Sequence, residues 1–139
     1  MRLGLRKSQQ TSPSATVNPE SGAALRLKQL CGGDNDFYGA MSRLMFLDPK
    51  RILTPLEKVL EEAQDFETTG NKLRAEVGYR VAGGISLYRG DENGVSKYFS
   101  KAASLAGDTH PEYQVILKRS DEAVAVARKF YEEFGSIAL

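Results

Sequence analysis

Residues 79–105 read YRVAGGISLYRGDENGVSKYFSKAASL, and this stretch carries most of the information about the fold. Its first half places Gly83 and Gly84 in a run with helical periodicity, where each glycine costs about 1 kcal/mol of helix stability relative to alanine. A neighbouring helix that approaches a backbone without Cβ atoms supplies a compensating gain. The sequence therefore predicts that the helix over residues 71–89, which also contains Gly78, lies at the centre of a helical bundle.

This central helix has two contrasting sides. One side is lined by larger, mostly apolar residues and a glycine, namely Leu73, Val77, Val81, Gly84 and Tyr88. Much of the other side is small, with Ala75, Ala82, Gly83 and Ser86. Large apolar side chains favour burial, and small ones permit close contact between helices. We therefore expect neighbours on both sides and a helix that is the most buried in the molecule.

Residues 89–94, RGDENG, turn the chain into a helix over about 93–106. The residues of that helix expected to face inward recur every three or four positions, as an amphipathic helix requires. They are Val95, Tyr98, Phe99, Ala102 and Leu105.

An earlier stretch, residues 32–47, repeats this layout as GGDNDFYGAMSRLMFL. Its glycine pair stops one helix, because glycine adopts the left-handed conformation at little cost. Asp34 or Asn35 is suited to cap the next helix, whose apolar residues again recur every three or four positions. The repetition of a Gly-Asp turn before an amphipathic run predicts a stack of helical hairpins.

Three further helices complete the expected fold. One precedes the glycine pair at residue 32. A second starts at Thr54, which is expected to cap it, with Glu57 completing a capping box. The last starts at Thr109, with Glu112 closing a second capping box, and runs as one helix to about residue 134. No run alternates with period two for long enough to form a strand. We therefore expect an all-α fold of about six helices packed as antiparallel hairpins.

The chain of 139 residues is long enough for one domain with a real core, and we assign this domain to residues 21–136. Residues 1–20 differ in composition, because they combine hydroxyl-rich and proline-containing sequence with Arg2, Arg6 and Lys7. Such a segment buries too little apolar surface to offset its ordering entropy, and we interpret it as a flexible basic tail. An organelle transit peptide is the alternative interpretation of the same composition.

Bulk composition argues against several classes of protein. The net charge of +1 creates no global field that would attract nucleic acid or an anionic membrane. No apolar run approaches the roughly 20 residues that span a bilayer, so we expect no membrane insertion. The single cysteine, Cys31, excludes an internal disulfide and fits a reducing compartment, which favours a cytoplasmic location.

Few residues are suited to chemistry. His110 is the only histidine, and its position between Thr109 and Pro111 is typical of the surface at a helix start. Cys31 beside the glycine pair is typical of a small buried apolar residue. The acidic face of the helix over 55–68 is typical of a solvated surface, and the chain contains no phosphate-binding glycine loop. We therefore expect no catalytic residue, no metal site and no cofactor.

The stretch over 79–105 resembles a tetratricopeptide-type helix–turn–helix. In that family, small residues at the crossing of the first helix are followed by a turn, and the second helix carries an aromatic residue and then an alanine. Gly83 and Gly84 match the crossing, and Phe99 and Ala102 match the second helix.

The turn of the motif matches Gly90-Asp91, and residues 27–49 repeat the layout with Gly33-Asp34 as the turn. The resemblance covers about half of the chain. It implies a scaffold whose stacked hairpins leave a concave surface that binds peptides or partner proteins.

Six residues are the candidates for partner binding: Tyr38, Met45, Phe46, Arg74, Arg80 and Arg89. The first three widen the apolar arc of the helix over 36–47 beyond what one core contact needs, which predicts a surface for a protein partner or a second copy of the chain. The three arginines lie on the central helix, where they are suited to meet acidic peptide groups. Their solvation, or pairing with the neighbouring acidic helix, is the alternative.

A second functional hypothesis is nucleic-acid binding. Residues 75–90, AEVGYRVAGGISLYRG, resemble the helix-turn-helix of small repressors, with Ala75 and Ile85 at the positions that hold the two helices together. Tyr79 stands where the turn glycine belongs, and the near-zero net charge also disfavours a nucleic-acid partner. We therefore expect a non-enzymatic scaffold and keep the helix-turn-helix protein as the alternative.

Overall fold

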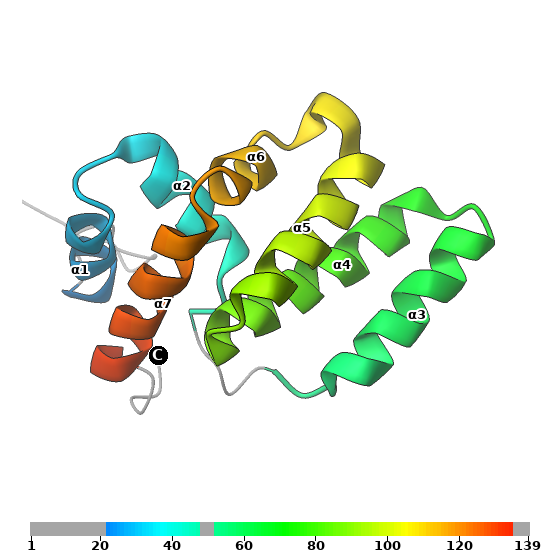
Figure 1. Cartoon of the computed structure of the whole chain (residues 1–139), viewed down its shortest axis with the longest axis horizontal. Helices are drawn as coiled ribbons and strands as arrows, with labels where there is room; N and C mark the ends of the chain where they lie inside the picture. Colours follow the sequence, from blue (N-terminus) through cyan, green and yellow to red (C-terminus); the bar gives the residue numbers. More distant parts are fainter. Residues whose placement is uncertain (1–21, 48–51, 135–139) are drawn as a thin grey trace, which may run out of the picture.

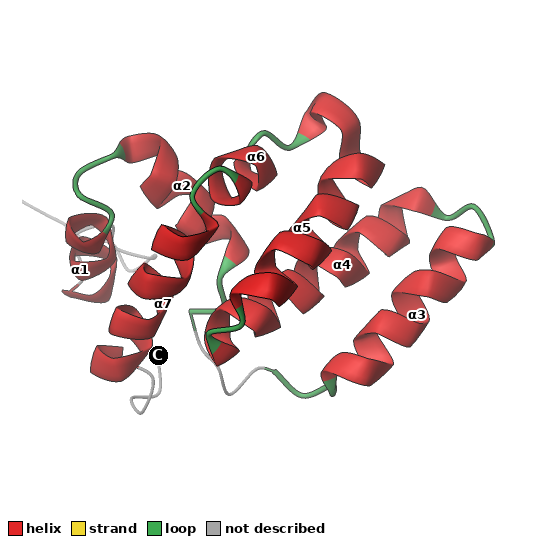
Figure 2. Ribbon diagram, viewed as in Figure 1, coloured by secondary structure: helices red, strands yellow, loops and turns green. Residues whose placement is uncertain are grey.

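The computed structural model describes residues 22–47 and 52–134, and in this part of the chain helices are joined by loops and turns, without strands (Figure 2). The predicted all-α class is therefore confirmed. The α-helices are α1 (Gly22–Leu30), α2 (Asn35–Leu44), α3 (Leu56–Thr68), α4 (Lys72–Arg89), α5 (Glu92–Ala106), α6 (Glu112–Leu117) and α7 (Ser120–Phe134), with a short 3-10 turn at Gly107–Thr109. The predicted tail over residues 1–20 and the last residues of the expected domain lie outside the described part.

The helices form two groups (Figure 1). Helices α3, α4 and α5 lie side by side and alternate in direction, so α4 forms an antiparallel hairpin with each neighbour. Helices α1, α2, α6 and α7 make up the other group, in which α2 packs on α6 and α1 packs on α7. Helix α4 also contacts α2 and α7, which joins the two groups, whereas α3 packs chiefly on α4 at the edge of the molecule.

The repeated Gly-Asp pair forms the same structure twice. Gly33 and Gly90 both adopt the left-handed conformation, with φ of 77° and 72°. The carboxylate of Asp34 accepts a hydrogen bond from the N–H of Phe37 at 3.1 Å, and that of Asp91 accepts one from Gly94 at the same distance. Each glycine therefore ends one segment, and each aspartate caps the next helix.

The glycines of α4 lie against neighbouring elements, as the sequence predicts. A Cβ atom added to Gly78 would lie 2.7 Å from the Cβ of Ala63 on α3. One added to Gly83 would collide with the ring of Phe99 on α5. One added to Gly84 would lie 2.7 Å from the ring of Phe46. Neighbours thus occupy the space beside all three glycines.

The prediction for the larger side of α4 is wrong in part. Leu73 is 70% exposed, Val77 49% and Tyr88 45%, whereas Ala75 and Ala82 on the small side are fully buried. The physical reason is that α3 and α5 both pack on the small side, where short side chains let the helix axes approach. Leu73, Val77 and Tyr88 are left facing outward, whereas Gly84 of the same side is covered by Phe46.

The C-terminal segment forms two helices where one was expected, because α6 ends at Leu117 and α7 begins at Ser120. Arg119 lies in the turn between them, with its guanidinium 2.7 Å from the carboxylate of Asp34 and 4.0 Å from the centre of the Phe37 ring. These contacts to the start of α2 fix the turn. Ser120, followed by two acidic residues, was the available signal for a new helix start.

Neither predicted capping box forms. Helix α3 has Pro55 at its N-cap and α6 has Pro111, and neither start has a side-chain cap hydrogen bond. The hydroxyl of Thr109 instead donates to the carbonyl of Ala106 at 2.8 Å, so this threonine closes the end of α5. The Thr109 hydroxyl thus donates to the last turn of the preceding helix, and the N–H groups at the start of α6 receive no side-chain cap.

The core lies where the two groups of helices meet. Its largest fully buried side chains come from both groups and include Leu27, Phe37, Met41, Ile85, Leu87, Phe99, Tyr113, Ile116 and Phe130. A smaller cluster of Val59, Ala82 and Ile85 joins α3 to α4. Since this second cluster is small, part of the apolar surface of α3 and α4 is left over for a site.

Candidate functional site

The main candidate is an apolar depression that we name the α3–α4 groove, with a volume of about 720 Å³. Its lining comes from α3, α4 and the segment between α2 and α3, and it consists of Phe46, Ile52, Leu53, Thr54, Val59, Glu62, Ala63, Phe66, Leu73, Arg74, Val77, Gly78, Val81 and Ile85. The lining includes Gly78 and Ala63, the point at which the backbones of α4 and α3 come close together.

Hydrophobic exposure is concentrated at this groove. Six large hydrophobic side chains are exposed in the described part of the chain, and three of them, Leu53 (86%), Leu73 (70%) and Val77 (49%), line the groove. Exposure falls along α4 from Leu73 to Ile85, which is 2% exposed. The lining that α4 contributes to the groove therefore changes from exposed to buried between these two residues. Contiguous exposed apolar surface of this kind marks interaction sites in soluble proteins.

Two opposite charges border the groove. Glu62 projects from α3, and Arg74 projects from α4 with its guanidinium 5.6 Å from the centre of the Phe66 ring. Neither side chain forms an ion pair with another described residue. Each is therefore available to an opposite charge on a bound molecule.

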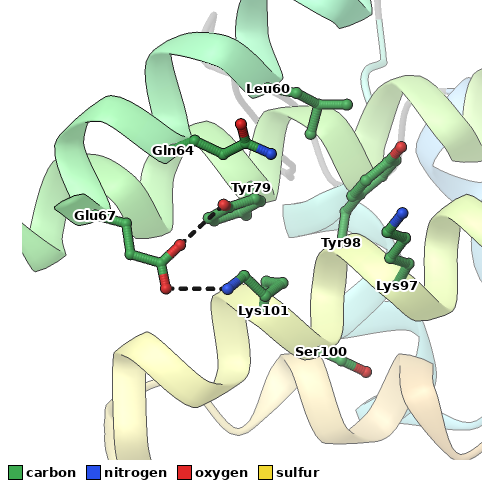
Figure 3. A pocket seen from close by; sticks show the side chains of 8 residues that line it. All are labelled: Leu60, Gln64, Glu67, Tyr79, Lys97, Tyr98, Ser100 and Lys101. Carbon is green, nitrogen blue, oxygen red and sulfur yellow. Dashed lines mark hydrogen bonds and ion pairs between the residues drawn. The ribbon is translucent and has the colours of Figure 1, made fainter.

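A second depression, the α3–α5 cleft, lies on another side of α3 and has a volume of about 640 Å³. It is lined by Leu60, Gln64, Glu67, Tyr79, Lys97, Tyr98, Ser100 and Lys101 (Figure 3). Glu67 accepts hydrogen bonds from the Tyr79 hydroxyl at 3.0 Å and from the Lys101 ammonium at 2.9 Å. Both donors lower the pKa of Glu67, while burial and the nearby carboxylate raise the pKa of Tyr79 to about 12.

Several polar groups of the α3–α5 cleft form hydrogen bonds with one another. Glu67 joins α3 to α4 through Tyr79 and to α5 through Lys101, so this network ties three helices together (Figure 3). Lys97 lies over the Tyr98 ring at 5.9 Å from its centre. No nucleophile stands beside a general base among these lining residues. The arrangement is that of a structural ion pair and a hydrogen bond that connect three helices.

A cluster of polar side chains lies between α4 and α6. Glu76 is only 6% exposed, and its carboxylate accepts a hydrogen bond from the Tyr113 hydroxyl at 2.9 Å. The single histidine, His110, lies between two carboxylates, with 3.5 Å from its Nε2 to Glu76 and 3.5 Å from its Nδ1 to Glu112. Burial raises the pKa of Tyr113, and the Glu76 carboxylate adds to this effect. The hydrogen bond from Tyr113 links α6 to α4 and supplies the buried Glu76 side chain with a polar partner.

Cys31 is 3% exposed, and burial raises the pKa of its thiol to about 11. A thiolate is the nucleophilic form of cysteine, so this protonated, covered thiol is poorly suited to nucleophilic chemistry at neutral pH.

The structure separates the three predicted apolar binding residues. Met45 is 5% exposed and belongs to the core, which removes it from any surface. Tyr38 is half-buried and packs against the same core. Phe46 lines the α3–α4 groove with its ring against Gly84. The chain bends after α2 ends at Leu44, so the apolar arc is divided between the core and the groove.

The three predicted arginines do not converge on one site. Arg74 borders the α3–α4 groove, Arg80 donates a hydrogen bond to the carbonyl of Arg43 at 3.0 Å, and Arg89 is exposed at the other end of α4. Since each faces a different neighbour, they do not form one basic surface.

The alternative helix-turn-helix interpretation of residues 75–90 is wrong, because α4 runs without interruption from Lys72 to Arg89. In the described ranges, no group of three or more His, Cys, Asp or Glu side chains is arranged to hold a metal ion. Among the helices that the structure describes, none combines the length and the apolar character needed to cross a membrane.

Sequence reasoning missed Leu53, Leu73 and Val77 as site residues, because the periodicity of α4 marked its larger stripe as core. The sequence does contain a signal for the site, because α4 has large apolar residues on one side and small residues on the other. A helix in a small bundle rarely has neighbours all round, and small residues mark the side where they pack closest.

Comparisons of the chain with protein-family models, with curated proteins and with solved structures found no match in any of the three.

Proposed function

We propose that this chain is a non-enzymatic helical scaffold, similar to the tetratricopeptide-type hairpin proteins, that acts in protein–protein interaction or assembly through the α3–α4 groove. The observation that carries the proposal is the exposure of Leu53, Leu73 and Val77 around one apolar depression. Exposed apolar side chains cost solubility, and their grouping at a preformed groove is typical of a docking surface. A cytoplasmic location belongs to the same proposal, because Cys31 is a free, buried thiol.

The stripe on α4 favours a helix as the bound element. Leu73, Val77 and Val81 follow one another at intervals of four residues, so they form a ridge along α4. Ridges of this spacing pack into the grooves of a second helix, and recognition of an amphipathic helix by an apolar groove is a recurring mode of protein binding.

Site-specific photo-crosslinking tests this proposal in cells. A crosslinking amino acid at Val77, 49% exposed, is compared with the same amino acid at Leu25, which is 43% exposed on α1 and lies outside the groove. We expect discrete crosslinked products from position 77 and background labelling from position 25. Equal labelling at the two positions would show that the groove binds no protein.

A further inference from the structure

We infer that the occupant of the α3–α4 groove is a second copy of this chain, bound as a twofold-symmetric dimer. This inference rests on the proposed function, since it names the partner for the same groove. Three observations favour a second copy over a foreign partner: the charges at the groove, the net charge of the chain and the shape of the α4 stripe.

The charges at the groove are self-complementary. A twofold interface brings the same surface of both copies together, so a residue that contacts another receives the reciprocal contact from the second copy. The groove carries one carboxylate, Glu62, and one guanidinium, Arg74, without ion pairs in the described part of the chain. A dimer in which Glu62 of each copy faces Arg74 of the other forms two equivalent ion pairs and leaves neither charge unmatched.

The overall charge permits this association. A net charge far from zero keeps proteins apart by repulsion, whereas this chain carries only +1. The two opposite charges at the groove also cancel each other, so the groove does not attract a strongly acidic or strongly basic partner over long distances.

The shape of α4 suits a symmetric contact. Leu73, Val77 and Val81 form a ridge spaced by four residues, and ridges of this type on two identical helices interdigitate with each other. In this arrangement the more exposed Leu73 or Val77 of the second copy packs against the apolar lining of the groove, which includes Val81 and Phe66. Each copy thus supplies both a protruding residue and a place that accepts one.

Sedimentation velocity of the full chain at concentrations from about 1 µM to about 1 mM tests the inference. We expect the weight-average mass to rise from monomer to dimer over this range. Val77→Glu should weaken dimerisation at least tenfold, because it buries an unpaired carboxylate in the interface. Leu25→Glu, the matched control outside the groove, should leave the dimerisation constant unchanged.

A charge exchange provides a second test that does not depend on the apolar variant folding well. Glu62→Arg alone and Arg74→Glu alone should each weaken dimerisation, because like charges then face each other. The double variant Glu62→Arg/Arg74→Glu should recover it, since the pair is restored with reversed signs. Circular dichroism establishes that each variant is helical before its mass is measured.

A chain that stays monomeric throughout the range, or a dimer equally insensitive to Val77→Glu and to the charge exchange, overturns the inference. If the chain is monomeric but the crosslinker at position 77 still captures a different protein, the proposed function stays intact. Only the second copy is then refuted as the partner.

Discussion

Gly78 of α4 lies so close to Ala63 of α3 that a Cβ atom at position 78 would stand 2.7 Å from the Cβ and 3.3 Å from the Cα of the alanine. Neither atom belongs to a flexible side chain, so the two helices would have to move apart to admit a methyl group. This contact sets the separation of α3 and α4, and therefore the width of the groove between them.

The first prediction follows from this contact. Gly78→Ala gains about 1 kcal/mol of helix propensity but costs about 1–3 kcal/mol through overpacking, so we expect a net loss of up to about 2 kcal/mol in the free energy of unfolding. Gly39→Ala is the matched control, because Gly39 lies within α2 with nothing within 4 Å of the added Cβ. Urea denaturation should show stabilisation by about 1 kcal/mol for Gly39→Ala. If Gly78→Ala and Gly39→Ala change the free energy of unfolding in the same direction, the packing argument is contradicted.

The second prediction concerns the hydrogen bond between Tyr113 and Glu76. Tyr113→Phe removes a donor from a carboxylate that is only 6% exposed, and hydrogen bonds to charged groups contribute about 1.5–3 kcal/mol. We expect a loss of that size in the free energy of unfolding. Tyr98→Phe is the control, since the Tyr98 hydroxyl has no hydrogen-bond partner among the described residues.

A double-mutant cycle of Tyr113→Phe with Glu76→Met, which removes the carboxylate acceptor at similar side-chain length, isolates the interaction between the two side chains. A coupling energy near zero would show that the cost of Tyr113→Phe arises from packing and not from the hydrogen bond.

The third prediction is a dependence of stability on pH at the turn between α6 and α7. The N–H of Phe37 and the guanidinium of Arg119 both lower the pKa of Asp34, and the same guanidinium lowers the pKa of Glu122. Carboxylates with a lowered pKa in the folded state stabilise the protein above their unfolded pKa values, which lie near 4. This stabilisation is lost as the pH falls through the lower folded values.

Arg119→Gln removes the shared partner of both carboxylates. We expect the variant to lose less stability than the wild type when thermal denaturation is compared at pH 6 and at about pH 3. Arg89→Gln serves as the control, because Arg89 forms no ion pair with the described residues. An acid-induced loss that is identical in all three proteins would show that Arg119 does not govern it.

The fourth prediction concerns Cys31. Burial keeps this thiol protonated, with a pKa of about 11, and covers it with core residues. We expect a thiol reagent such as a disulfide dye to react with the folded protein far more slowly than with the protein in urea at the same pH. Reaction at the same rate in both states would refute the burial of Cys31.

Much of the helical framework could be predicted because its signals are local. The two Gly-Asp turns, the amphipathic run of α5 and the crowded positions of Gly78, Gly83 and Gly84 all appear in the sequence, and the structure contains each of them. The predicted capping boxes at Thr54 and Thr109 are wrong, because a proline occupies the N-cap of each helix and the Thr109 hydroxyl donates to the carbonyl of Ala106.

The site could not be predicted in the same way. Periodicity shows that α4 has two apolar sides but not which of them another helix covers. Met45 and Phe46 adjoin in sequence, yet one lies in the core and the other lines the groove, because the chain bends after α2. Arg119 breaks the last helix through contacts to Asp34 and Phe37, which are distant in sequence.

The amino-acid sequence by itself determined where the helices run and which glycines must lie against a neighbour, because turn chemistry and helix propensity act over a few residues. Only the tertiary structure decided that α3 and α5 both pack on the small side of α4 and that the stripe with Leu73 and Val77 faces outward. That choice depends on how all the helices together bury the most apolar surface, and no single segment contains that information.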